Sequence, residues 1–94
     1  VYYSPNHKSS LTLAEQVQKD VCASFSQMPS RKITLAKDIY LMEHLQIPAI
    51  LVECGFLSNY EEKELLKTEA YQTKIAMQIA ASLIRFLSEY GNTL

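Results

Sequence analysis

Apolar residues recur at helical spacing over an early segment of the chain, from about Leu11 to Ser26. Such spacing predicts an amphipathic helix that buries one face against the rest of the protein. Ser9 and Ser10 directly precede the segment and are candidate N-cap residues. The apolar positions that indicate the buried face are Ala14, Val17, Val21 and Phe25, widened by Leu13 and Cys22.

A second apolar stripe predicts a longer helix from Glu69 to Tyr90, with Thr68 as its cap. A short helix is predicted before it, because the run Ser58–Glu62 contains two overlapping capping boxes. The stripe of the longer helix consists of Ile75, Ile79, Leu83 and Leu87, with Tyr71, Ala76, Ala80 and Ile84 beside it.

Three further segments have strand character. Val1 to Tyr3 is β-branched and aromatic and ends at a turn. Ile47 to Glu53 is the clearest strand, and its apolar centre lacks alternation, as in a strand that is covered on both faces of a parallel sheet. Residues 33–42 favour a further strand, because 33–35 alternates weakly and 38–42 fits a short strand, although periodicity does not exclude a helix over 39–45.

The order of these elements predicts an α/β fold, in which helices flank a mixed or parallel sheet on both faces. Two or three strands make a poor parallel sheet by themselves, and the first strand has no preceding neighbour to pair with. A length of 94 residues is enough for one domain at most. We therefore expect residues 1–94 to be the C-terminal half of a layered domain.

Composition excludes several classes of protein. Hydrophobic residues make up 48% of the chain and charged residues 20%, which is ordinary for a globular protein. A net charge of −1 provides no basic surface for nucleic acid. The 2 glycines, Gly55 and Gly91, are too far apart for a phosphate-binding loop. No apolar run approaches the ~20 residues of a membrane span.

Glu53 is the residue whose position most suggests chemistry. It ends the apolar strand and is followed directly by Cys54 and Gly55. Ligands of open α/β sheets bind at the carboxyl ends of strands, where Glu53 would lie. A carboxylate there could take the proton of a water molecule that a metal ion activates. It could also pair with a lysine or arginine, or accept backbone N–H groups, without any chemistry.

The histidines and cysteines give a weaker signal. His7 and His44 lack the paired spacing of a zinc site, so surface or packing roles are expected, and no metal ligand is predicted in this chain. Cys54 should point away from Glu53, to the other face of the strand. Cys22 lies near the apolar edge of the first helix, and packing roles are expected for both cysteines.

The run Ile47-Pro48-Ala49-Ile50-Leu51-Val52-Glu53-Cys54-Gly55-Phe56-Leu57-Ser58-Asn59 resembles a signature of zinc-dependent N-acetylmuramoyl-L-alanine amidases. The likeness covers essentially the whole chain. It includes Ala36–Met42, which corresponds to the preceding strand of that family, and the two helices that follow. The cysteine after the glutamate is similar to that of the sporulation and germination amidases that act on spore cortex.

The resemblance implies that the parent protein hydrolyses peptidoglycan outside the cytoplasm, in the cell wall or the spore envelope. Such enzymes cleave the amide between N-acetylmuramic acid and the L-alanine of the stem peptide, using a zinc ion that activates water. The catalytic glutamate of the family corresponds to Glu53, as general base and then as proton donor. The family's zinc ligands would lie upstream of Val1, so the chain alone is expected to be inactive.

Two other hypotheses stay open. The half-domain could be a non-catalytic interaction module, whose open sheet edge binds a partner chain or swaps with a second copy. It could also be a complete small hydrolase with paired carboxylates, which would need a second acid near Glu53. The sequence does not determine the stem-peptide specificity, an activating accessory protein or the oligomeric state.

Overall fold

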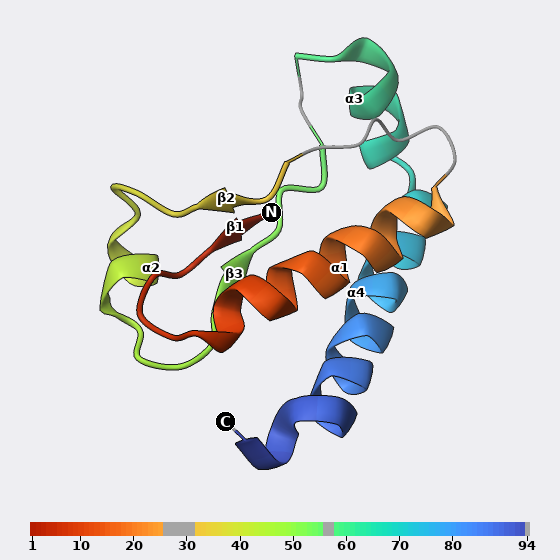
Figure 1. Cartoon of the computed structure of the whole chain (residues 1–94). Helices are drawn as coiled ribbons and strands as arrows, with labels where there is room; N and C mark the ends of the chain where they lie inside the picture. The colour runs from red at the N-terminus through yellow and green to blue at the C-terminus, as the bar shows by residue number, and fades with distance from the viewer. Residues whose placement is uncertain (26–31, 56–57, 94) are drawn as a thin grey trace.

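A computed structural model describes residues 1–25, 32–55 and 58–93. Within these ranges a three-stranded mixed sheet and four α-helices form an α/β arrangement (Figure 1), which confirms the predicted fold class. The elements are β1 (Tyr2–Tyr3), α1 (Ser9–Ser24), β2 (Thr34–Leu35), α2 (Tyr40–His44), β3 (Ile50–Leu51), α3 (Tyr60–Leu66), α4 (Glu69–Tyr90) and the 3-10 turn η1 (Gly91–Thr93).

The sheet has the strand order β2-β1-β3, so β1 lies in the centre. β1 is parallel to β2 and antiparallel to β3, with Tyr2 opposite Leu51 and Tyr3 opposite Ile50. Of the two predicted alternatives, the mixed sheet is therefore correct. The backbone of Ala49 extends the pairing beyond β3, because its carbonyl accepts a hydrogen bond from the Ser4 N–H at 3.0 Å.

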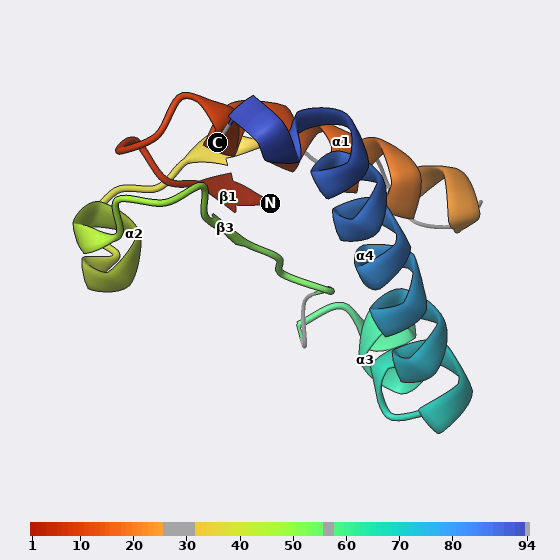
Figure 2. The same ribbon diagram turned by 90° about the horizontal axis from the view of Figure 1, so that it is seen from below.

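One face of β3 is packed and the other is open. Ile50, Val52 and Cys54 pack against the core that α1 and α4 share with the sheet. Figure 2 shows both helices on the same side of β3. Leu51 points to the opposite face by strand alternation and is 40% exposed. The expectation that this strand is covered on both faces is therefore wrong for the described residues. An apolar run without alternation did not reveal which face would lack a neighbour.

α1 lies between the sheet and α4, and its predicted apolar face is buried, with Ala14 and Val17 fully enclosed. The predicted start of this helix is wrong. α1 begins at Ser9, and Lys8 at the N-cap makes no side-chain capping bond. Ser10 lies inside the helix and is buried. Its Oγ accepts a hydrogen bond from the Ala49 N–H at 3.1 Å. This serine thus ties α1 to the segment that enters β3.

α4 has the predicted bounds, and the predicted cap is confirmed, since Thr68 Oγ1 accepts a hydrogen bond from the Tyr71 N–H at 3.3 Å. The buried side chains of α4 are Ile75, Ser82 and Phe86. The predicted burial of its last stripe positions is wrong: they are partly or largely exposed, Leu83 by 37% and Leu87 by 57%. None of the helices within the described ranges is long and apolar enough to cross a membrane.

A polar link joins α1 to α4. The Asp20 carboxylate accepts a hydrogen bond from Ser82 Oγ at 2.8 Å and pairs with Arg85 Nη1 at 2.9 Å. Ser82 is almost completely buried, so Asp20 satisfies a hydroxyl that would otherwise be costly to enclose. The sequence pattern placed Asp20 on the polar side of its helix and gave no sign of this link.

The segment 33–45 contains both a strand and a helix. β2 is Thr34–Leu35, and the helical alternative for 39–45 is correct, because α2 spans Tyr40–His44. A strand over 38–42, and the strand expected there from the family likeness, are wrong. Ser4 Oγ donates a hydrogen bond to the Met42 carbonyl at 2.7 Å, and Asn6 Nδ2 donates to the Leu45 carbonyl at 3.0 Å. These two hydrogen bonds satisfy carbonyl groups at the end of α2, where a helix has no further N–H groups of its own to donate.

Candidate active site

Glu53 lies two residues after β3, where the chain leaves the sheet. The predicted bounds of this strand, Ile47–Glu53, are therefore wrong, because only Ile50–Leu51 pairs as a strand with β1. Its neighbours Val52 and Cys54 both pack against the core. Strand alternation therefore directs Glu53 to the open face of the sheet. Its side chain is exposed and, within the described residues, forms neither a hydrogen bond nor an ion pair. Both carboxylate oxygens are thus free to accept protons from water or a ligand.

Close packing against α3 fixes the turn that follows Glu53. Gly55 has a φ of 159°, and a Cβ added there would lie 3.1 Å from Leu66 Cδ1 and 3.6 Å from Glu62 Cβ. A side chain at this position would push against α3 or displace the turn. The glycine therefore lets α3 approach the backbone directly behind the candidate catalytic carboxylate.

Asn59 sets the start of α3. Its Oδ1 accepts a hydrogen bond from the Glu62 N–H at 3.1 Å, so the second of the two predicted capping boxes provides the cap. Glu62 is buried beside Gly55. The capping-box spacing identified Asn59 and Glu62 in the sequence. Only the fold shows that they lie behind the candidate site.

The described residues do not fit a zinc site. No group of three or more histidine, cysteine, aspartate or glutamate side chains among them could hold a metal ion. His7 is half-buried, and its Nδ1 accepts a hydrogen bond from the Ser9 N–H at 3.1 Å. His44 is exposed and stacks on Tyr40, with 3.9 Å between ring centroids. Both histidines thus make contacts with residues close to them in the sequence.

The cysteines also have packing roles. Cys54 is half-buried against the core, on the face opposite Glu53. Cys22 is half-buried too, and its Sγ accepts a hydrogen bond from Gln18 Nε2 at 3.1 Å. Both are free thiols. Among the described residues, neither thiol contacts a histidine or a basic side chain that would activate it as a nucleophile.

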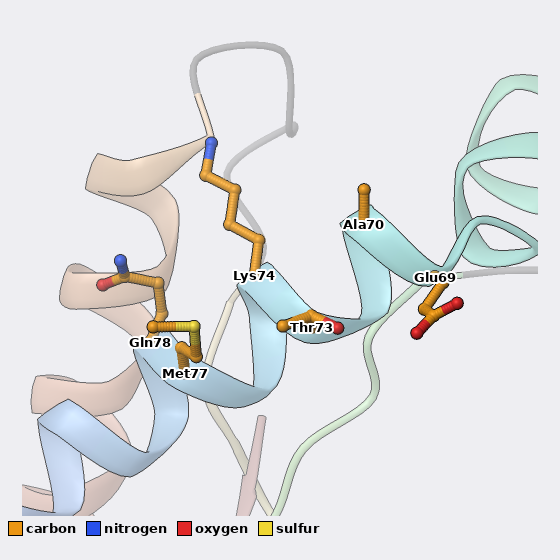
Figure 3. Close-up of a pocket in the computed structure, with 6 residues that line it drawn as sticks. All are labelled: Glu69, Ala70, Thr73, Lys74, Met77 and Gln78. Carbon is orange, nitrogen blue, oxygen red and sulfur yellow. The ribbon is translucent and has the colours of Figure 1, made fainter.

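A shallow hollow lies on the surface of α4 and is separate from Glu53. All of its lining residues come from the first half of this one helix (Figure 3). Lys74 extends from the rim to the end of α1, where its Nζ lies 4.5 Å from the centre of the Phe25 ring. The residues that line the hollow are Glu69, Ala70, Thr73, Lys74, Met77 and Gln78.

The chain is similar to curated amidases over nearly its whole length. It is 31% identical over 90 residues to the germination-specific N-acetylmuramoyl-L-alanine amidase of Bacillus subtilis strain 168, a match that covers 96% of this chain and 36% of the relative. It is 34% identical over 85 residues to the N-acetylmuramoyl-L-alanine amidase AmiA of Escherichia coli K12, covering 90% of this chain and 29% of the relative. The chain thus spans about a third of the length of these relatives. No solved structure matches it significantly.

The sequence profile of the N-acetylmuramoyl-L-alanine amidase family matches residues 1–85. This match takes in all the strands and α1 to α3, together with most of α4. The chain therefore belongs to the N-acetylmuramoyl-L-alanine amidase family, whose members are zinc-dependent peptidoglycan hydrolases that act on the cell wall.

Proposed function

We propose that residues 1–94 form the C-terminal part of the catalytic domain of an extracytoplasmic peptidoglycan hydrolase. The complete domain cleaves the amide between N-acetylmuramic acid and the L-alanine of the stem peptide. Family membership supports the substrate class, and similarity to a germination-specific relative favours a role at the spore envelope. That the chain spans about a third of its relatives supports its being part of a domain.

In this proposal Glu53 is the general base. An exposed carboxylate just beyond β3, with no hydrogen bond or ion pair in the described part of the chain, carries the assignment. Glu53 accepts a proton from the water that attacks the amide carbonyl. When the C–N bond breaks, the carboxyl group returns this proton to the leaving amine. The products are the lactyl carboxylate of muramic acid and a peptide with a free L-alanine amino group.

The zinc ligands of the complete domain are proposed to lie in polypeptide outside this chain. No described cluster of side chains is suited to a metal ion. We therefore expect the 94-residue chain to release no peptide from peptidoglycan, even with added zinc. Measurable release of peptide by the purified chain would contradict the proposal that the zinc ligands lie outside it.

The role of Glu53 can be tested in a chimera. The chimera is the Bacillus subtilis germination-specific amidase with its 90 matched residues replaced by this chain. We expect Glu53→Gln to lower the rate of L-alanine amino-group release about 10²–10⁴-fold, because the amide side chain cannot accept the proton. Glu61→Gln is the matched control, since Glu61 is exposed on α3. A Glu53→Gln chimera with nearly normal activity would refute the assignment.

A non-catalytic interaction module is the second candidate function. Several large apolar side chains of α4 are exposed, which favours association with another chain. The mass in solution separates the two candidates: an inert chimera together with a stable homodimer of the 94-residue chain would favour the module.

A further inference from the structure

α4 has more apolar surface than its neighbours cover. Ile75 and Phe86 face α1 and are buried, but further apolar residues lie on the opposite side of the helix and are exposed. We call the uncovered part the outer stripe, and helical periodicity places its members together on the side away from α1. They are Thr73, Met77, Ala80, Ala81, Ile84 and Leu87, all of them exposed.

The outer stripe lacks the charges expected of a helix face in water. Met77 is 65% exposed and Ile84 is 69% exposed. Beyond the first turn of α4, the charged residues Lys74, Arg85 and Glu89 lie on a different flank by helical periodicity. The stripe is uncharged and mostly apolar, apart from the hydroxyls of Thr73 and of Ser88, which lies within the same arc. A surface of this kind is typical of one that another polypeptide covers. The hollow in Figure 3 overlaps its N-terminal end at Thr73 and Met77.

The edge of β3 gives a second, independent indication of a missing neighbour. β3 pairs only with β1 among the described strands, so its other edge has unpaired backbone groups. Ile75 and Ile79 of α4 share one core with Ile50 and Val52, so α4 lies on the packed face of this edge strand. A strand added to the free edge of β3 would lie beside the core that β3 and α4 share.

We propose that the outer stripe of α4 and the free edge of β3 together bind the upstream part of an amidase catalytic domain. This inference rests on the proposed function. The occupant is chosen because the matched relatives have about three times the length of this chain, and their additional polypeptide is available to cover these surfaces. An α/β segment suits both surfaces, since it supplies a strand for the edge and apolar side chains for the stripe.

Cysteine labelling tests the docking surface directly. Ala81→Cys and Ile84→Cys are made in the isolated chain and in the chimera described above, and the rate of reaction with a maleimide is measured. Glu89→Cys is the matched control on the charged flank of the same helix. Labelling of Cys22 and Cys54 in the unsubstituted proteins is subtracted. We expect both stripe cysteines to react at least tenfold more slowly in the chimera, while the control changes less than twofold.

Two results would overturn the docking proposal. In one, the stripe cysteines react as fast in the chimera as in the isolated chain, whether or not the chimera is folded. In the other, they are already protected in the isolated chain and its mass is that of a dimer, so that a second copy is the occupant. Protection in a chimera that does not hydrolyse peptidoglycan would uphold docking and count against the proposed function. Protection that survives Glu53→Gln while hydrolysis is lost would support both.

Discussion

α1 and α4 are both amphipathic helices with apolar residues at three- and four-residue spacing, yet their surroundings differ. α1 lies between the sheet and α4, whereas α4 packs against α1 and α3 and leaves its outer stripe exposed. Val17 of α1 is completely buried, but Ile84 of α4 is one of the most exposed apolar residues. The comparison teaches that spacing identifies a face suited to burial, while the number of neighbours decides how much of it is buried.

The largest expected difference between the two helices comes from a buried charge. Val17→Asp places a carboxylate in the core, and we expect it to remove the whole stability of the isolated chain, about 5 kcal/mol or more. Ile84→Asp is expected to change the free energy of unfolding by less than about 1 kcal/mol, because the side chain is in water. Urea denaturation followed by circular dichroism measures both. Equal effects would show that α4 is as enclosed as α1.

Adjacent positions on α4 provide a finer test. Phe86 is 2% exposed and packs into the core, so Phe86→Ala should cost about 3–5 kcal/mol of unfolding free energy. Leu87→Ala should cost less than about 1 kcal/mol in the isolated chain. Thermal and urea denaturation report both values. A larger cost for Leu87→Ala in the chimera than in the chain would show that the outer stripe is covered there, and an equal cost would not.

The polar link between the helices should have the smallest effect. Asp20→Ala leaves the buried Ser82 hydroxyl without its acceptor, and we expect a loss of about 1–3 kcal/mol. Arg85→Ala should cost less than about 1 kcal/mol, because the Arg85 side chain is 57% exposed and the ion pair faces solvent. Denaturation of the single and double variants gives the coupling between these residues. A greater loss from Arg85→Ala would mean that the ion pair dominates the link.

Local sequence signals predicted much of the fold. The cap at Thr68, the bounds of α4 and the buried face of α1 depend on neighbouring residues and helical geometry alone. The pairing of β3 with β1, and the place of Ser10 inside α1, depend on contacts between segments far apart in the sequence. Periodicity does not contain that information.

For the candidate site too, the sequence revealed one part and only the fold revealed the other. Glu53 was identifiable from the apolar run before it and from the likeness to the amidases. The packing of Leu66 against Gly55 and the burial of Glu62 were not, because they depend on where α3 returns to the strand end.

By itself, the sequence determined the α/β class and the family and made Glu53 the candidate catalytic residue, since these depend on residue order and short-range geometry. Only the tertiary structure decided which face of β3 is packed, which apolar residues of α4 stay in water and which hydroxyl Asp20 satisfies. The physical reason is that burial is a property of pairs of surfaces. A helix or strand can present an apolar face, but solvent is excluded from it only where another element lies against it.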